Sequence, residues 1–557
     1  MKILIVGGYG TFGSRLVELL CGEPGLTLLV AGRSLVRAEA FCRRESKANL
    51  IPSYFDRDGD LQAQLAPLKP DIVVDASGPF QAYGEKPYAL AEAAFAAGAD
   101  YLDLADGVAY VRAITQIDGQ ARARGRVALS GLSTVPALSA AVARHLAVGL
   151  TRIEHIAVGI APSPHAPVGL SVIKAIAGYA GQPIDMLRDA KVRKAYALID
   201  SRTMQINIPG IAPLRPIRFA LVDVPDLLLL RDIWPDIQSV WVGAGVRPAL
   251  LHRLLWCCAW LVRWGALDNL RRWAGLMRRV LNKARWGEDR GGMIVTVSGE
   301  GEAGFETRSW HLIAEGNDGP MIPAMAAAAI IRRYLAGTPP QPGARPAHGE
   351  LELGDFLPLM AGRAIETGVR VQRKSDRGLP LYPQVMGSAF ERLAEPLKAL
   401  HWLEGTASFG GRADIARGQG YLANLVCRLV GFPEGGENVP VTVAFSTRNS
   451  KESWRRTFAG KSFVSTQELG RGRRAGLLVE RFGPMAFGLA VLEDEGRLRL
   501  TVRDWSFLGI PLPARLAPGG EVFEHGDGGR FNFSVAITFP LIGLLVHYRG
   551  WLVPAGA

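Results

Sequence analysis

The residues with the clearest capacity for chemistry form a glycine-rich segment near the start of the chain, Gly7-Gly8-Tyr9-Gly10-Thr11-Phe12-Gly13. Glycines at this spacing allow a tight turn and a close approach of the backbone to a pyrophosphate, because no side chain intervenes. An apolar run over 2–6 precedes the segment and a helical pattern over 14–20 follows it. The free N–H groups at the start of that helix would face the phosphates. We therefore predict a dinucleotide phosphate site at Gly7, Gly10, Thr11, Phe12 and Gly13.

The residues after the next predicted strand indicate which dinucleotide binds. A buried strand over 26–31 ends in Gly32-Arg33-Ser34, where an NAD site would place an acidic residue on the ribose 2′-hydroxyl. Arg33 stands there instead, and Arg37 follows one helical turn later. A guanidinium forms charge-assisted hydrogen bonds with a 2′-phosphate. We predict NADP as the cofactor, bound by Arg33, Ser34 and Arg37; the alternative is that Arg33 is a solvated residue at a helix start.

A small-residue segment, Ser77-Gly78-Pro79, follows the predicted strand 71–75. Ligands of open parallel sheets bind at the carboxyl ends of the strands. We expect Ser77, Gly78 and Pro79 to flank the nicotinamide ribose, whereas a plain turn between strand and helix is the alternative.

No catalytic residue can be assigned from the residue pattern. Tyr83, Asp103 and Asp106 lie near predicted strand ends, and His311 lies in a predicted strand of the middle region. A lone histidine in a strand is more often structural, and the tyrosine and the two aspartates are equally weak candidates. The chain also lacks the Tyr-x-x-x-Lys pair that supplies the general acid of short-chain dehydrogenases.

The composition argues against several other classes of protein. The five cysteines are scattered and the nine histidines form no pair at ligand spacing, so we expect neither a disulfide framework nor a metal site. The apolar run at the N-terminus is too short for a signal peptide, and no stretch is long and apolar enough to span a membrane. We expect a cytoplasmic protein with no nucleic-acid partner, and a homodimer stays open.

The net charge of +12 is concentrated in one segment, 247–286. Leucines at helical spacing accompany five tryptophans and many arginines there, which is typical of an amphipathic helix at an anionic membrane surface. The alternative is a helix pair packed on a small sheet with solvated arginines. A peripheral position on the inner face of the membrane therefore stays open.

The order of predicted elements gives an α/β protein with several domains. Strands and helices alternate over 1–135, as in a Rossmann domain, and an α+β domain follows over 136–320. A helix over 321–340 returns to the first domain, and a linker over 341–378 leads to a strand-rich α+β domain over 379–557. We expect an antiparallel sheet or a partly open barrel there, with the run 535–546 as one bulged strand.

The N-terminal motifs closely resemble the NADP-binding domain of the saccharopine-dehydrogenase-like reductases. The resemblance rests on the glycine segment, Ala31-Gly32-Arg33, Ser77-Gly78-Pro79-Phe80 with Tyr83-Gly84, and Gly98-Ala99-Asp100-Tyr101-Leu102-Asp103. It implies a Rossmann domain with an inserted α+β domain and a pyridine nucleotide cofactor. The region from 379 to 551 resembles a domain of unknown function found fused behind such reductases.

The resemblance implies an NADP-dependent oxidoreductase that acts on a small or lipid-like carbonyl, imine or enoyl substrate. The alternative is a non-catalytic nucleotide- or lipid-binding protein that retains the Rossmann fold and lies at a membrane surface.

Overall fold

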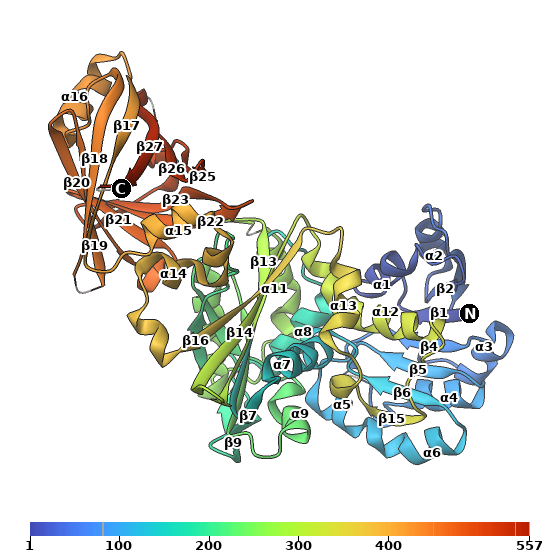
Figure 1. Cartoon of the computed structure of the whole chain (residues 1–557). Helices are drawn as coiled ribbons and strands as arrows, with labels where there is room; N and C mark the ends of the chain where they lie inside the picture. The colour runs from blue at the N-terminus through green and yellow to red at the C-terminus, as the bar shows by residue number, and fades with distance from the viewer. Residues whose placement is uncertain (81–82, 284, 449, 541, 556–557) are drawn as a thin grey trace. The chain divides into compact units, whose positions relative to one another are not determined.

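A computed structural model of the chain shows a mixed α/β architecture (Figure 1). The structure describes residues 1–80, 83–283, 285–448, 450–540 and 542–555. The chain forms two compact units. The first unit comprises Met1–Met204 and Ile217–Thr367, and the second comprises Gln205–Pro216 and Gly368–Ala557.

The first unit begins with a seven-stranded parallel sheet in the order β15-β6-β5-β4-β1-β2-β3, which is the Rossmann order with one added edge strand. Helices lie on both faces of the sheet (Figure 1). The strands are β1 (Lys2–Val6), β2 (Thr27–Gly32), β3 (Asn49–Tyr54), β4 (Ile72–Asp75), β5 (Asp100–Asp103), β6 (Val127–Ser130) and β15 (Gly343–Pro346). The helices are α1 (Gly13–Leu20), α2 (Leu35–Cys42), α3 (Leu61–Leu68), α4 (Ala89–Ala96), α5 (Val108–Ala113), α6 (Asp118–Ala123) and α12 (Ile322–Leu335).

The central strands of this sheet are continuous apolar runs because helices cover both of their faces. Every residue of β4 is buried, and so is β1 from Ile3 to Val6. The carboxyl ends of β1 and β4 are neighbours, with Val6 paired to Asp75. The glycine segment and Ser77-Gly78-Pro79, which we call the Ser77 segment, therefore lie side by side at the carboxyl ends of these strands.

The segment expected as a linker, 341–378, instead contains ordered structure. Its residues Gly343–Pro346 form β15, which pairs in parallel with β6, and Leu353–Met360 form helix α13. A four-residue strand is too short to show a periodic pattern, and its partner lies more than two hundred residues earlier. Helices α5 and α6 are separate elements, with a 3-10 turn over Ile114–Ile117 between them.

A second, mixed sheet follows the Rossmann strands, in the order β10-β11-β12-β7-β13-β14-β16. Its strands are β7 (Leu150–Ala161), β10 (Ser201–Met204), β11 (Ile217–Leu221), β12 (Ser239–Gly245), β13 (Arg290–Gly301), β14 (Gly304–Glu315) and β16 (Ile365–Arg373). A separate hairpin consists of β8 (Pro183–Arg188) and β9 (Lys191–Tyr196). The accompanying helices are α7 (Ser139–Ala147), α8 (Leu170–Tyr179), α9 (Asp226–Ile233), α10 (Ala249–Arg263) and α11 (Ala274–Lys283).

The second unit is built on an antiparallel sheet whose strands close into a ring. The order runs β22-β21-β20-β19-β18-β17-β27-β26-β25-β23, and β22 also pairs with β23. These strands are β17 (Thr406–Arg417), β18 (Gly436–Arg448), β19 (Lys451–Phe458), β20 (Lys461–Leu469), β21 (Leu478–Phe482), β22 (Met485–Asp494), β23 (Arg497–Phe507), β25 (Val522–Asp527), β26 (Arg530–Phe539) and β27 (Gly543–Pro554), with β24 (Ile510–Leu512) at an edge of β23. The helices are α14 (Leu381–Met386), α15 (Glu395–His401) and α16 (Tyr421–Val430).

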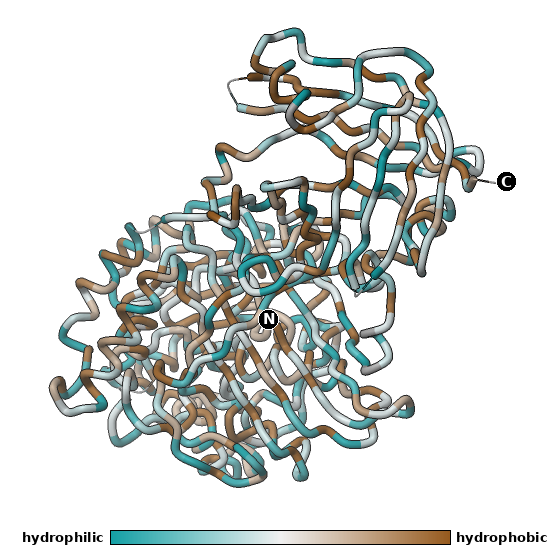
Figure 2. Tube along the Cα trace, turned by 90° about the vertical axis from the view of Figure 1, so that its left-hand side faces the viewer, coloured by the Kyte–Doolittle hydropathy of each residue, from teal (hydrophilic) through white to brown (hydrophobic). Residues whose placement is uncertain are grey.

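Figure 2 shows hydrophobic and hydrophilic residues alternating along these strands, as expected for a wall with one apolar face. The expected strand-rich domain is confirmed, and its barrel is closed rather than partly open. The prediction of one bulged strand over 535–546 is wrong. Antiparallel β26 and β27 meet there in a hairpin, because Pro540 and Gly543 favour a turn at the loop between them.

Residues 205–216, expected within the inserted domain, belong to the barrel unit. The Arg370 Nε donates to the Asn207 carbonyl at 2.8 Å, and the Glu493 amide donates to the Gly210 carbonyl at 3.2 Å. These are long-range contacts, so a sequence pattern could not have assigned the segment.

Candidate nucleotide-binding site

The glycine segment makes a turn that side chains could not occupy. Gly7 has a φ of +80°, and a Cβ placed on Gly13 would lie 2.2 Å from the Gly7 carbonyl oxygen. The Gly7 and Gly8 amides both donate to the Ala31 carbonyl, at 2.9 and 3.0 Å, which anchors the turn to β2. Helix α1 then begins at Gly13 behind Phe12, which forms no side-chain cap. The Ser14 amide in its first turn donates to the Gly10 carbonyl at 3.1 Å. Amides at the start of a helix are the donors that phosphates accept from.

The site residues predicted in this turn lie together at one edge of the sheet. Gly7, Gly10 and Phe12 are half-buried, Gly13 is buried, and Thr11 is exposed. Because this cradle depends on absent side chains, it fits the pyrophosphate of a dinucleotide.

Tyr9 connects the glycine segment to the start of α2. Its hydroxyl accepts a hydrogen bond from the Ser34 amide at 2.9 Å, and its ring lies 4.9 Å from the guanidinium of Arg37. The Ser34 hydroxyl caps α2 by accepting from the Arg37 amide at 3.4 Å. Sequence reasoning missed this role of Tyr9, since nothing but its place between two glycines marks it.

Arg33 and Arg37 are both exposed at this edge. Within the described part of the chain, neither forms an ion pair with a carboxylate. Their charges are therefore available to an anionic ligand that enters beside Tyr9.

The Ser77 segment is fixed by a buried carboxylate. Asp75, at the end of β4, has no exposed surface, and its Oδ1 accepts from the Ser77 amide at 3.0 Å and the Ser77 hydroxyl at 2.5 Å. The Tyr83 hydroxyl reaches both Asp75 at 3.2 Å and Ser77 at 2.9 Å. Arg57 neutralises the carboxylate, with its Nε 3.2 Å from Asp75 Oδ2. Burial, and then the Asp75 charge, raise the pKa of Tyr83 above its ordinary value, so this phenol stays protonated.

An aromatic cluster packs behind the same segment. Phe80 lies 5.1 Å, between ring centroids, from both Tyr83 and Tyr110. A Cβ on Gly7 would lie 3.0 Å from Ser77 Cα, so the glycine turn and the Ser77 segment touch. Gly78 and Pro79 lie half-buried in the same segment. Ser77, Gly78 and Pro79 are thus held beside the glycine turn, as expected of residues that share one ligand.

Asp103 ends the next strand and is a buried carboxylate with one unused oxygen. Its Oδ1 accepts from the Ala105 amide, the Ser130 hydroxyl and the Gly131 amide, at distances of 2.9–3.0 Å. No described group bonds to its Oδ2. Burial raises the pKa of Asp103 to about 7 even though these donors favour the carboxylate. Its bonds hold the β5 and β6 ends together, which is a positioning role.

The inserted domain comes close to the nucleotide site beside the glycine turn. A Cβ on Gly169 would lie 3.0 Å from Thr11 Oγ1, so the segment before α8 borders the glycine turn. The Val168 amide donates to Asn282 Oδ1 at 3.0 Å, which ties that segment to α11.

Three titratable residues, one from the Rossmann domain and two from the inserted domain, lie close to one another. Tyr179, in α8, lies near Asp106 from the Rossmann edge and Asp223 from the end of β11. Burial, followed by the charges of these two carboxylates, raises the pKa of Tyr179. Burial also raises the pKa of Asp223, and Asp106 adds to that rise. Sequence reasoning named Asp106 alone, because the other two residues come from distant segments with no recognisable motif.

His311 has a structural environment. It is buried in β14, and its Nε2 lies 2.8 Å from the Ser309 hydroxyl on the same strand. Among the described residues, no group of three or more metal-ligating side chains could hold an ion.

Comparison with known families decides the identity of the N-terminal domain. The saccharopine dehydrogenase NADP binding domain matches residues 3–129, which span the glycine turn and β1–β6. Residues 3–129 are therefore similar to that family of domains. The prediction from the N-terminal motifs is thereby confirmed, and the Rossmann domain is a nicotinamide-nucleotide domain of dehydrogenase type.

The barrel matches the model of a family without an assigned role. A domain of unknown function, DUF4166, matches residues 393–552, so the predicted fusion of a saccharopine-dehydrogenase-like domain with such a domain is also confirmed. No curated protein matches the chain.

Several oxidoreductases are among the solved structures that the chain matches. A dehydrogenase from Clostridium difficile is 8% identical and has a TM-score of 0.30, covering 65% of this chain and 96% of its own. A biliverdin reductase from Synechocystis, solved with biliverdin and NADP+, is 13% identical with a TM-score of 0.30, covering 64% of this chain and 95% of its own. A Gfo/Idh/MocA family oxidoreductase from Vibrio cholerae is 9% identical with a TM-score of 0.29, covering 61% of this chain and 91% of its own.

Proposed function

We propose that this protein is an NADP-dependent oxidoreductase that acts on a small or lipid-like carbonyl, imine or enoyl substrate. The observation that carries the choice of NADP is the pair of exposed arginines, Arg33 and Arg37, where an NAD site places an acid; neither forms an ion pair with a described carboxylate. A 2′-phosphate there would contact two guanidinium groups, and that of Arg37 packs on the Tyr9 ring.

In this proposal the cofactor supplies the hydride, and the chain supplies binding, orientation and the proton. Gly7, Gly10 and Gly13 hold the pyrophosphate, together with the amides of Thr11 and Phe12 at the start of α1. Ser34 orders the start of α2 beside the 2′-phosphate. Ser77, Gly78 and Pro79 position the nicotinamide ribose, and Asp75 fixes that segment.

The proton donor that we propose belongs to the Asp106–Tyr179–Asp223 cluster, which lies where the inserted domain meets the carboxyl edge of the Rossmann sheet. A carboxylic acid with a raised pKa and a protonated phenol can each deliver a proton to a substrate as it accepts a hydride.

The choice of cofactor is tested by titrating the protein with NADPH and NADH while following nucleotide fluorescence. We expect NADPH to bind at least tenfold more tightly than NADH. Arg33→Glu should weaken NADPH binding about 10- to 100-fold and leave NADH nearly unchanged, because the loss falls on a charge-assisted contact to the extra phosphate. Arg43→Glu is the matched control, since Arg43 is an exposed arginine that caps the far end of the same helix. Equal affinities for the two nucleotides in the wild type would reject NADP specificity.

We further propose that α10, α11 and the flanking residues of 247–286 contact an anionic membrane surface. Along α10 and just beyond it, Leu250, Leu254, Leu261 and Trp264 are exposed and fall on one helical stripe. Trp273, Leu276 and Val280 form a second exposed stripe at α11, and Arg278 and Arg279 lie off it. Exposed tryptophan beside arginine suits the boundary between acyl chains and headgroups. Among the described residues, no helix has both the length and the apolar character to cross a bilayer.

Flotation with vesicles of phosphatidylglycerol and phosphatidylcholine tests this surface. We expect binding at low salt that weakens as the salt concentration rises. A triple variant, Arg271→Glu, Arg272→Glu and Arg279→Glu, should bind at least tenfold less, since each basic residue near the surface contributes about 1 kcal/mol. Reversing Lys191, Arg193 and Lys194 on β9 is the control, because that exposed basic hairpin lacks tryptophan. Failure of the wild type to float at low salt would refute the membrane contact.

A further inference from the structure

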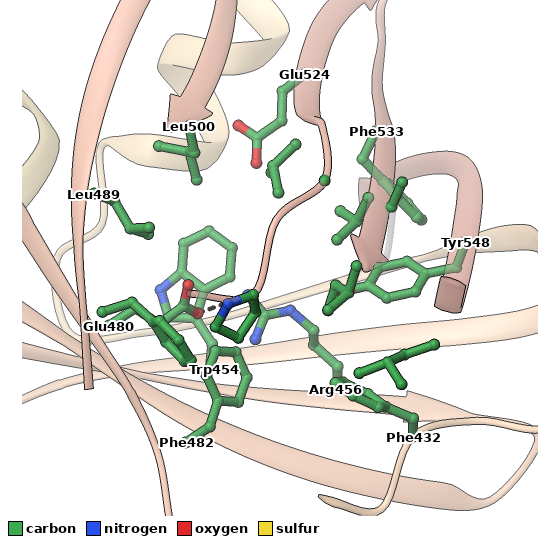
Figure 3. A pocket seen from close by; sticks show the side chains of 18 of the residues that line it. Phe432, Trp454, Arg456, Glu480, Phe482, Leu489, Leu500, Glu524, Phe533 and Tyr548 are labelled. Atoms are coloured by element: carbon green, nitrogen blue, oxygen red, sulfur yellow. Dashed lines mark hydrogen bonds and ion pairs between the residues drawn. The ribbon is translucent and has the colours of Figure 1, made fainter. Parts of the chain in front are cut away.

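The interior of the C-terminal barrel contains a cavity of about 180 Å³. Its walls are aromatic and aliphatic side chains from the barrel strands, among them Phe482, Leu489, Phe533 and Tyr548, and Phe432 from the segment after α16 (Figure 3). A dry apolar cavity of about 150 Å³ is enough to bind a molecule the size of benzene. The space therefore has room for a compact apolar ligand and exceeds an ordinary packing defect.

The polar groups in the cavity are few and are largely paired with each other. Arg456 forms an ion pair with Glu480 at 3.4 Å, and Ser465 donates to the same carboxylate at 2.7 Å. Glu524, which is 6% exposed, is 2.6 Å from His401 Nε2. Figure 3 places the Arg456–Glu480 pair and the Glu524 carboxylate at different sides of the apolar space. The guanidinium is already neutralised, and a further carboxylate faces the interior, so an anionic ligand would be disfavoured.

Two buried polar atoms in the cavity wall lack a protein partner. The Tyr382 hydroxyl and the Gln467 Oε1 have no hydrogen bond to any described group, although the two residues are 0% and 1% exposed. Leaving such atoms unsatisfied costs free energy, so buried polar groups are normally paired. One polar group on a ligand could satisfy the tyrosine hydroxyl or the glutamine oxygen.

The barrel wall is weakest at the seam between β23 and β25. These strands pair only over Leu498–Leu500 and Val522–Glu524, and a loop containing Pro518, Gly519 and Gly520 precedes β25 and lines the cavity. Exposed apolar side chains gather on this stretch of chain: Phe507, Leu508, Ile510 and Leu516. An apolar molecule would meet a compatible surface before it enters.

We propose that the barrel binds a neutral, compact apolar compound that carries one hydroxyl, carbonyl or amide group. The apolar part fills the space between the aromatic walls, and the polar group pairs with Tyr382 or Gln467. This assignment does not depend on the cofactor site or on the proposed reaction.

Calorimetric titration of the full-length protein with 1-octanol and with octanoate at pH 8 tests the proposal. We expect saturable binding of 1-octanol with a Kd of about 10–100 µM from the apolar area that it buries. Octanoate should bind at least tenfold more weakly because of its charge. Tyr382→Phe should weaken 1-octanol binding about three- to tenfold, as expected for the loss of one hydrogen bond.

Val443→Phe fills the cavity from β18, and Leu500→Phe fills it independently from β23. Each should lower octanol affinity at least tenfold, whereas Val464→Phe, at an exposed position of β20, should change it less than twofold. Circular dichroism identifies any variant that fails to fold. If one cavity-filling variant fails to fold, the octanol affinity of the other one tests the proposal. The proposal is overturned if the wild type gives no saturable binding, if every folded filling variant binds like the wild type, or if octanoate binds more tightly than octanol.

Discussion

The proposed nucleotide site is formed mainly by backbone atoms, whereas the barrel cavity is formed by side chains. At the proposed nucleotide site the backbone would do most of the binding, and side chains are excluded from a turn where a Cβ would meet a carbonyl oxygen at 2.2 Å. In the barrel, side chains from strands far apart in the sequence create the space and its polarity. A site made of backbone tolerates almost no added atom, whereas a site made of side chains adjusts in volume but depends on each buried charge having its partner.

The largest effect should come from adding one carbon to the backbone site. Gly13→Ala should lower NADPH affinity more than 100-fold, because the new Cβ would overlap the Gly7 carbonyl and open the turn. Fluorescence titration measures the loss. Gly22→Ala is the matched control, since a Cβ there has no heavy atom within 4 Å. Retention of wild-type affinity by Gly13→Ala would show that the turn does not bind the phosphates.

In the barrel the comparable perturbation is the removal of a charge rather than the addition of an atom. Arg456→Met leaves Glu480 buried without its cation, which should lower the free energy of unfolding by about 3 kcal/mol. The surface pair between Lys461 and Glu434 is the control, and Lys461→Met should cost less than about 1 kcal/mol. Urea denaturation followed by tryptophan fluorescence compares the two variants. Equal losses would mean that the interior pair is screened like a surface pair.

Asp103, in the Rossmann domain, contrasts with Glu480, because it is a buried carboxylate that pairs with no cation among the described residues. Its pKa rises from 3.8 to about 7 on folding, so the folded state holds this proton more tightly than the unfolded state. Its contribution to stability is therefore present below pH 4 and is lost as the pH rises through 7.

Asp103→Asn should remove this pH dependence and raise the free energy of unfolding at pH 8 by about 2 kcal/mol relative to the wild type. The amide oxygen can keep the three donors that Oδ1 accepts from. At pH 4 the variant and the wild type should be similar in stability. Urea denaturation at the two pH values makes the comparison, and a loss of stability at pH 8 would show that the ionised carboxylate is favoured in the fold.

Much of the first domain could be predicted from local sequence. A few neighbouring residues are enough to interpret the glycine spacing, the apolar runs of β1 and β4, and the position of Arg33. Strand β15 was missed because its pairing with β6, rather than its own four residues, makes it a strand. In the barrel, the edges of β26 and β27 were misread because a proline in an apolar run can mark either a bulge or a turn.

The sequence by itself determined that a dinucleotide turn opens the chain, because a phosphate cradle made of backbone needs only glycines and a helix start in immediate succession. Tertiary structure alone decided that Tyr9 supports Arg37, that Asp75 fixes Ser77 and Tyr83, and that Tyr179 and Asp223 join Asp106. It also decided that the C-terminal strands close around a cavity. These features depend on contacts between residues distant in the chain, and the pairing of such residues follows from packing rather than from any local pattern.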